Sequence, residues 1–388
     1  MTASNNGTTS GRKIAVVLGG GGIKGFAHIG VLKALEERGI KPALYAGTSI
    51  GAMLAAATVT GMSANELARR AESLRRRDLF RINHFGMLMD RMKSTSIYLE
   101  EPLRTLTASV MPEQRFDEVN MPLLVNTVDL ERGTQIVWGL PGLRDVSIRD
   151  AVYASCALPG FFPPGRVDGR ICVDGGVIDN MPAHVAGLGM DMVIAVDVGS
   201  ADLAHVPDIS EQGFASIYMR AATTMMHSLQ QFPLVAWNGP PMLLIRPKVG
   251  RDWLSFANSA EHIREGYRAA KKALEHFETY LEQPGGIFPR KRVSLTVSKE
   301  KCIGCGLCAA IAPTYFGMQN GKAFARTTVV EWSAADGDFV RQCPTLAIDA
   351  TRIDLVTPPH TAELVDGDSA APAQPAQPAQ PAGAIDAA

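Results

Sequence analysis

The fold of this 388-residue chain is decided by residues 13–26, which read KIAVVLGGGGIKGF. The apolar run Lys13–Leu18 is typical of a buried parallel strand, and a helical pattern begins directly after the glycines. Consecutive glycines let backbone N–H groups converge on one point, and the first turn of a helix adds the positive end of its dipole. The sequence therefore predicts an anionic group at this loop.

A glycine loop between a strand and a helix has four possible roles, and the flanking residues distinguish among them. A phosphate-binding P-loop needs Ser or Thr after its lysine, but Lys24 is followed by Gly25, so this interpretation fails. A dinucleotide site needs an acid at the end of the next strand, and residues 41–46 contain none. An oxyanion hole and a tight turn that serves strand–helix packing both stay compatible with the loop.

Residues 12–283 alternate between strand-like and helical patterns. Short apolar runs bounded by Gly, Pro or Asp predict buried strands at Lys13–Leu18, Leu123–Val128, Asp191–Val198 and Met242–Ile245. Helical patterns occupy Gly25–Arg38, Ile50–Thr60, Ala64–Arg77 and Ala260–Leu281. Strands that alternate with helices imply an α/β fold in which a mostly parallel sheet is covered on both faces.

Ser49 lies in a second glycine motif, GTSIG at 47–51, between a short apolar strand and a helix of small residues. This is the context of a nucleophile elbow, in which the flanking glycines permit a sharp turn and the serine projects above the sheet. An ordinary helix N-cap is the alternative role for Ser49. The glycine loop upstream favours the nucleophile.

The base for this serine is not expected to be a histidine. His262 and His276 lie on a helix that is predicted to be at the surface, where solvated side chains are the default. Asp174 follows a strand-like stretch and precedes Gly175 and Gly176, a turn that would expose its carboxylate. A base needs only to reach the serine proton, so Asp174 is the candidate partner of Ser49.

Together these motifs resemble those of the patatin-like phospholipases, with the closest similarity to bacterial members. The resemblance extends over about residues 13–250 and includes the stretches His28–Leu32, Ala154–Pro164 and Asp174–Pro182. It implies a patatin-like three-layer sandwich and a lipid acyl hydrolase with a Ser–Asp dyad. Ser49 would be the nucleophile and Asp174 the general base. The implied oxyanion and motif residues are Gly20, Gly21, Gly22, Lys24, Gly25, Gly47, Gly51, Gly175 and Gly176.

The glycine loop departs from plant members of this family at two positions. Plant members usually carry Asp where this chain has Gly19 and Arg where it has Lys24. Neither change affects backbone donors, but a lysine cannot make the bidentate contacts of an arginine. The resemblance implies acyl transfer on a lipid ester, in which Ser49 attacks the carbonyl and water later releases the fatty acid.

Four of the six cysteines cluster near the C-terminus. Cys302, Cys305 and Cys308 form a C-x2-C-x2-C run, and Cys343 is followed by proline. The pattern resembles ferredoxins, and Ala312 stands where a two-cluster ferredoxin has the cysteine that binds its other cluster. The resemblance implies one [4Fe-4S] cluster, held by these four cysteines in a small α+β ferredoxin-like domain. A zinc ribbon is the weaker alternative, because it prefers two C-x2-C pairs.

The remaining cysteines, Cys156 and Cys172, are expected to be small buried hydrophobic residues. The predicted organisation is a flexible N-terminus at 1–11, an acyl hydrolase domain at 12–285, a ferredoxin-like domain at 286–355 and a disordered Pro/Ala/Gln tail at 356–388. The tail carries acids without Lys or Arg and has too little apolar surface to fold.

Several observations bear on location and partners. The chain has a net charge of −1, without the basic excess of a nucleic-acid binder, so no nucleic-acid partner is expected. The sequence contains no 18-residue apolar run, and its first eleven residues do not have the pattern of a signal peptide. Free thiolates also need a reducing compartment, so a cytoplasmic location is expected.

A basic segment precedes a Met/Phe-rich stretch at 85–89. Its arginines are Arg69, Arg70, Arg75, Arg76, Arg77 and Arg81. Such a segment is compatible with contact at the inner face of an anionic membrane, and a solvated helix face is the equal alternative. A redox partner protein is also expected for the cluster. The competing function is electron transfer or redox sensing, with the patatin-like domain acting mainly in lipid binding or docking.

Overall fold

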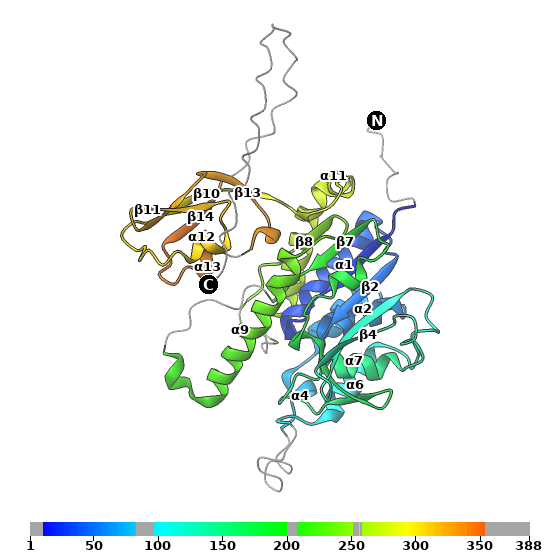
Figure 1. Cartoon of the computed structure of the whole chain (residues 1–388). Helices are drawn as coiled ribbons and strands as arrows, with labels where there is room; N and C mark the ends of the chain where they lie inside the picture. Colours follow the sequence, from blue (N-terminus) through cyan, green and yellow to red (C-terminus); the bar gives the residue numbers. More distant parts are fainter. Residues whose placement is uncertain are drawn as a thin grey trace, which may run out of the picture.

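The computed structural model describes residues 11–82, 96–199, 208–250, 256, 258–337 and 339–353. These residues form a large domain around one broad sheet and a small domain that contains the clustered cysteines (Figure 1). The predictions for residues 1–10, for the Met/Phe-rich stretch at 85–89 and for the tail lie outside the described residues.

The large sheet has nine strands among the described residues, in the order β5-β6-β3-β2-β1-β7-β8-β9, with β4 also paired to β3. Six strands run parallel: β1 (Ile14–Leu18), β2 (Leu44–Thr48), β3 (Leu123–Asp129), β7 (Met192–Val196), β8 (Met242–Ile245) and β9 (Ile287–Phe288). Three are antiparallel at one end: β4 (Thr134–Trp138), β5 (Gly165–Val167) and β6 (Arg170–Asp174). The prediction of a mostly parallel sheet is confirmed.

Helices cover the sheet. The longer ones are α1 (Ala27–Arg38), α2 (Ile50–Val59), α3 (Ala64–Ser73), α6 (Glu100–Val110), α7 (Ile148–Cys156), α9 (Gly213–Val235) and α10 (Ser259–Ala273). Short ones are α4 (Arg76–Leu79), α8 (Ala183–Ala186) and α11 (Phe277–Leu281), with 3-10 turns η1 (Gly22–Phe26), η3 (Gly175–Val177), η4 (Ile209–Gln212) and η5 (Leu274–His276). The single helix predicted over Ala64–Arg77 is wrong. Leu74 is extended, and the Asp78 carboxylate accepts the Arg75 N–H (2.8 Å), which starts a new helix.

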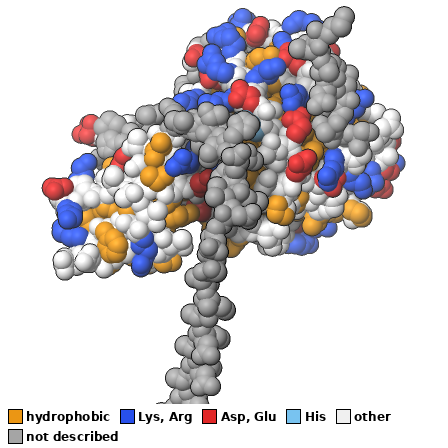
Figure 2. Space-filling view, turned by 90° about the horizontal axis from the view of Figure 1, so that it is seen from above, with side chains coloured by type: hydrophobic (Ala, Val, Ile, Leu, Met, Phe, Trp, Pro, Cys, Tyr) orange, Lys and Arg blue, Asp and Glu red, His pale blue; other side chains and the backbone are white. Residues whose placement is uncertain are grey.

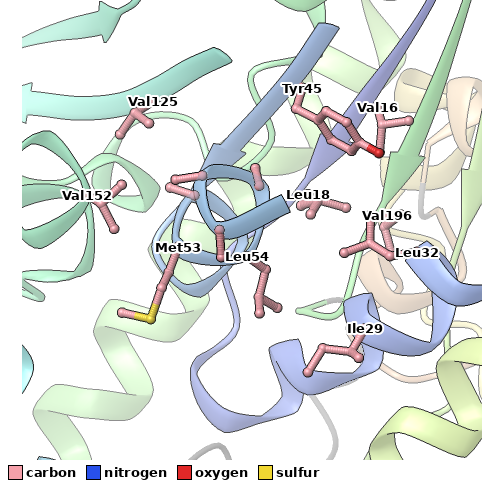
Figure 3. Close-up of a cluster of buried hydrophobic side chains, with 14 of the residues drawn as sticks. Val16, Leu18, Ile29, Leu32, Tyr45, Met53, Leu54, Val125, Val152 and Val196 are labelled. Atoms are coloured by element: carbon pink, nitrogen blue, oxygen red, sulfur yellow. The ribbon is translucent and has the colours of Figure 1, made fainter. Parts of the chain in front are cut away.

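The main core lies between the sheet and the layer of α1, α2 and α7. Side chains such as Leu18, Ile29 and Met53 meet there and exclude water (Figure 3). A second buried cluster covers the opposite face of the sheet and includes Met181 and Leu234. Apolar side chains therefore cover both faces of the sheet, as expected for an α/β fold with three layers.

Two glycines let α1 and α10 cross at very short range. A Cβ at Gly30 would lie 1.9 Å from the Ile263 carbonyl oxygen, and one at Gly266 would lie 1.8 Å from that of Ala27. This close crossing buries His262, which is only 3% exposed, and burial lowers its pKa. The prediction of a solvated His262 is therefore wrong, because the helical pattern does not reveal how closely a second helix can approach.

The small domain is an α+β unit. It contains a three-stranded antiparallel sheet of β13 (Val329–Trp332), β10 (Lys291–Val297) and β14 (Ile348–Arg352), and a hairpin of β11 (Phe316–Gln319) and β12 (Lys322–Ala325). Its helices are α12 (Leu307–Ile311), α13 (Phe339–Gln342) and the turn η6 (Ala334–Asp336). Leu295, Phe316 and Phe339 form the centre of its own core.

The large sheet continues past the domain boundary predicted at residue 285. Strand β9 pairs in parallel with β8, through Met242 beside Ile287. The two domains also share a buried contact, in which Ala334 of η6 packs into the same cluster as Leu234 of α9. The boundary therefore lies between β9 and β10, at Pro289 and Arg290.

The surface is mixed in charge on the face seen from above, where Lys and Arg side chains are interspersed with Asp and Glu (Figure 2). None of the helices in the described ranges has the length and apolar character needed to span a bilayer.

Candidate functional site

The register of the sheet brings Ser49 and Asp174 to the same level. Thr48 of β2 pairs with Asn126 of β3, and the next residue of β3, Thr127, pairs with Asp174. Ser49 follows Thr48 and is therefore level with Thr127. Two residues that are far apart in sequence meet because β6 runs back antiparallel beside β3.

Ser49 occupies a strained turn between β2 and α2. Its φ of 57° and ψ of −130° are rare for a residue with a side chain, as expected for a nucleophile elbow. Gly51 permits the turn, because a Cβ there would lie 2.0 Å from the Leu18 carbonyl oxygen. The Ser49 N–H is donated to the Ser155 hydroxyl (2.9 Å), which in turn donates to the Asn126 carbonyl (2.7 Å). These bonds hold the turn in place.

Asp174 ends β6 and is almost fully buried. Its carboxylate accepts the Gly176 N–H (2.8 Å) and a hydrogen bond from the Ser49 side chain. Burial raises the pKa of Asp174 from 3.8 to about 6, although both hydrogen bonds act in the opposite direction. A carboxyl with this pKa is ionised at neutral pH and is basic enough to accept a serine proton.

The glycine loop after β1 is held by two elements. The Gly19 N–H donates to the Val196 carbonyl (3.0 Å), and the Gly20 N–H donates to the Asn180 carbonyl (3.2 Å). The Asn180 amide donates in return to the Gly20 carbonyl (3.0 Å). The N–H of Gly20 is therefore engaged, and Gly21 and Gly22 are the loop donors at the start of η1, where helical N–H groups have no partner within the helix.

His28 of α1 also holds the glycine loop in place. It is fully buried, and its Nε2 lies 2.8 Å from the Gly19 carbonyl oxygen. Burial lowers its pKa to about 4, so the ring is neutral at physiological pH and can donate one N–H to that carbonyl. The histidine that follows the glycine loop is a positioning residue for the loop.

Ser49, Asp174 and the residues Gly20–Gly22 line a cavity of about 680 Å³. The rest of its lining is mainly apolar and comes from α1, α2, α3, α4, α6 and α9, with the aromatic side chains of Phe80, Phe161 and Phe162 among it. A mainly apolar cavity that also contains a serine and a carboxylate is suited to a hydrocarbon chain with one reactive ester.

The four clustered cysteines line a second, small cavity in the other domain. Cys302, Cys305 and Cys308 come from the loop and helix after β10, and Cys343 follows α13. The Ala323 N–H points to the Cys302 sulfur (3.4 Å), and the Ala347 N–H to that of Cys343 (3.3 Å). Backbone N–H groups directed at sulfur stabilise thiolates and the clusters they bind.

The thiols also influence one another. Burial raises the pKa of Cys308, and the nearby Cys302 and Cys305 add to the increase. Burial also acts to raise the pKa of Cys343, but hydrogen bonds from Ala347 and Thr345 outweigh it and lower the pKa. Within the described ranges, no three His, Cys, Asp or Glu side chains are arranged to hold a single metal ion. Cys302, Cys305, Cys308 and Cys343 would be the residues that hold a four-iron cluster, whose ligands are cysteine thiolates.

Residues 16–186 match the family model described as patatin-like phospholipase. The chain contains a patatin-like phospholipase domain. Residues 297–350 match the 4Fe-4S single cluster domain of ferredoxin I, so a 4Fe-4S domain follows the phospholipase domain. Both family resemblances predicted from the sequence are confirmed.

Several curated proteins are similar to the phospholipase domain. An uncharacterized NTE family protein of Mycobacterium bovis is 33% identical over 201 residues, which cover 52% of this chain and 53% of that protein. Human patatin-like phospholipase domain-containing protein 6 is 35% identical over 50% of this chain and 14% of its own length. Lysophospholipase nte1 of Neosartorya fischeri is 29% identical over 75% of this chain and 20% of its own length. The chain spans about half or less of the length of these relatives.

Two solved structures are also similar. VipD from Legionella pneumophila is 17% identical, with a TM-score of 0.37 over 68% of this chain and 66% of that chain. The type III effector protein ExoU is 15% identical, with a TM-score of 0.36 over 70% of this chain and 54% of that chain.

Only some of the predicted motif residues of the phospholipase domain lie at the cavity. Ser49, Asp174 and Gly20–Gly22 meet at the cavity, whereas the Lys24 side chain is fully buried outside its lining. Gly25, Gly47, Gly51 and Gly175 permit close packing: a Cβ at each would lie 2.0–2.5 Å from a neighbouring atom. Gly176 instead supplies its N–H to Asp174.

Sequence reasoning named no role for Asn180, Ser155 or His28. All three lie in stretches that carried the family resemblance, and this resemblance was the only indication in the sequence that they support the site. Cys172 is buried as predicted. Cys156 lines the cavity that contains Ser49, and burial and the charge of Asp174 raise its pKa.

Proposed function

We propose that this chain is a serine acyl hydrolase that cleaves fatty acyl esters of lipids through Ser49 and Asp174. The observation that carries the proposal is that Ser49, in a strained turn, and the buried Asp174 carboxylate line the same mainly apolar cavity of about 680 Å³. The names of the relatives, which include a phospholipase domain-containing protein and a lysophospholipase, support a lipid ester as substrate.

The proposed reaction has two steps. Ser49 Oγ attacks the ester carbonyl and gives its proton to Asp174, while the N–H groups of Gly21 and Gly22 stabilise the negative oxygen. Asp174 then protonates the departing alcohol, and the acyl group stays on Ser49. In the second step, Asp174 takes a proton from water and the hydroxide attacks the acyl-enzyme. Asp174 then returns this proton to Ser49 Oγ as the bond to the acyl group breaks, and the fatty acid leaves.

The cysteine site is proposed to hold one [4Fe-4S] cluster on Cys302, Cys305, Cys308 and Cys343. These residues fit that group, because four thiols share one cavity and two of them accept backbone N–H groups. When bound, such a cluster transfers one electron at a time. Cys305 is exposed, as is its neighbour Ile303, so a redox partner protein can reach this edge of the domain.

Electron transfer without hydrolysis is the second candidate function, and the exposed edge at Cys305 favours it. The strained turn at Ser49 favours the hydrolase instead, because a lipid-docking domain has no need of such a turn. A reducing compartment such as the cytoplasm suits four free thiolates, and contact with the inner face of a membrane would supply lipid.

The test is release of free fatty acid from a panel of phospholipids and lysophospholipids by the full chain with its cluster. Ser49→Ala is expected to abolish release, while Ser63→Ala, at an exposed N-cap of α3, retains it. Full release by the Ser49→Ala protein would refute the hydrolase. Equal rates of fatty acid release with the cluster oxidised, reduced or removed would show that hydrolysis does not depend on the redox state of the cluster.

A further inference from the structure

Helix α9 carries large apolar side chains on its exposed side. Phe232 is 74% exposed and Met225 is 59% exposed, values that are unusual for residues of this kind. The exposed set on this helix, the α9 stripe, consists of Ile217, Tyr218, Met225, Leu229, Phe232 and Val235. At 3.6 residues per turn, these positions fall within an arc of about 120°. The α9 stripe is therefore one continuous face of the helix.

The α9 stripe is continuous with the catalytic cavity. Tyr218, Met225 and Leu229 belong to the stripe and also line the cavity that holds Ser49. The other members, Ile217, Phe232 and Val235, extend the same face away from the cavity. An apolar path thus leads from the outer surface of α9 to the dyad.

The charges of two segments that line the cavity favour an anionic surface. Residues 213–235 contain one arginine and no Asp, Glu or Lys. Leu79 and Phe80, from α4 and its C-terminal end, also contribute to the lining. The surrounding segment, residues 64–82, has six arginines against three acids. In Figure 1, α9 and α4 both reach the lower side of the molecule.

We propose that the α9 stripe docks on an anionic lipid surface, so that the catalytic cavity faces this surface. This inference rests on the proposed hydrolase and adds the face by which the enzyme meets its lipid. An uncharged apolar helix face gains by leaving water for the acyl region of a bilayer, and neighbouring arginines are attracted to anionic headgroups. A lipid entering along α9 would meet apolar side chains until its ester reaches Ser49.

The test is binding of the full chain with its cluster to vesicles of phosphatidylcholine, alone or in equal mixture with phosphatidylglycerol. Ser49→Ala is the background for every sample, so that no lipid is hydrolysed during sedimentation. Adding Phe232→Ser is expected to weaken binding to the mixed vesicles about tenfold, since a buried phenyl group would be lost from the bilayer. Leu188→Ser is the matched control, because Leu188 is 73% exposed and lies outside the α9 stripe and the cavity lining.

Binding that falls with Phe232→Ser and persists with Leu188→Ser would support the proposal, provided that both variants show the far-UV circular dichroism of the parent. Unchanged binding of the Phe232→Ser protein would overturn it, as would a parent that binds neither kind of vesicle. A dimer that dissociates with Phe232→Ser in the absence of lipid would identify the stripe as a contact between copies. Hydrolysis of a water-soluble ester by the chain with Ser49 intact tests the proposed function separately.

Discussion

Asp174→Asn is expected to abolish ester hydrolysis and, at the same time, to make the folded chain more stable at alkaline pH. The carboxyl is buried, and its pKa is raised from 3.8 to about 6 in the folded chain. Asn has nearly the same shape and can still accept the Gly176 N–H, but it cannot take the proton of Ser49. The same substitution thus removes the base and a buried charge.

The direction and the size of the stability change follow from the linkage between proton binding and folding. A carboxyl whose pKa is higher in the folded state binds its proton more tightly there, so the stability it contributes is complete below pH 3.8 and is lost as pH rises through about 6. The difference of about two pKa units corresponds to a loss of roughly 3 kcal/mol at pH 8. At pH 5 only about half of that loss has occurred. The Asn variant has no such loss.

The assay compares the free energy of unfolding of parent and variant in denaturant at pH 8 and at pH 5, followed by intrinsic tryptophan fluorescence. The variant should be more stable at both pH values, and its advantage should be about twice as large at pH 8. Asp168→Asn, at an exposed turn, is the control and should change neither stability nor hydrolysis. Hydrolysis by the Asp174→Asn protein, or an equal stability difference at the two pH values, would refute the reasoning.

Three further predictions concern the same sites. The rate of hydrolysis by the parent should rise with pH as Asp174 ionises, and at pH 5 it should be about one tenth of the plateau rate. A flat profile between pH 5 and pH 8 would contradict the role of Asp174 as the base. Gly20→Ala should lower the free energy of unfolding by about 1–3 kcal/mol and lower kcat at least about tenfold. The reason is that the new Cβ would lie 2.4 Å from Asn180 Oδ1 and break the hydrogen bond from the Asn180 amide that holds the loop. Wild-type kinetics of this variant would exclude a role of the bond in positioning the loop. Cys305→Ser should lose the visible absorbance and the bound iron of the cluster while Cys172→Ser keeps both, and equal iron in the two proteins would contradict the ligand set.

The sequence alone predicted most of the central parallel strands and the motifs of the large domain. Short apolar runs marked β1, β3, β7 and β8, because a strand buried on both faces leaves a local signature. The antiparallel strands β4 and β5 were missed, since they lie at the end of the sheet, where strands are short and mixed in polarity. The two-residue strand β9 was assigned to the wrong domain, because only pairing with β8 identifies it.

The candidate site was predicted in part. Ser49 and Asp174 were found through motifs that serve local turns, and such turns depend on neighbours in sequence. The engaged N–H of Gly20 and the support from Asn180 could not be found, because both depend on a contact between loops 160 residues apart. For the same reason, the sequence did not reveal that His262 is buried or that the Lys24 side chain lies away from the cavity.

By itself, then, the sequence determined two domains, a serine elbow, a carboxyl partner and a set of four cysteines, because each is encoded in a few consecutive residues. The tertiary structure decided what lies around them: the register that brings Asp174 level with Ser49, the donors left in the glycine loop, and the cavity lined partly by α9. The physical reason is that register, burial and cavity shape depend on packing between distant segments, and the pattern along any one segment contains no record of its partner.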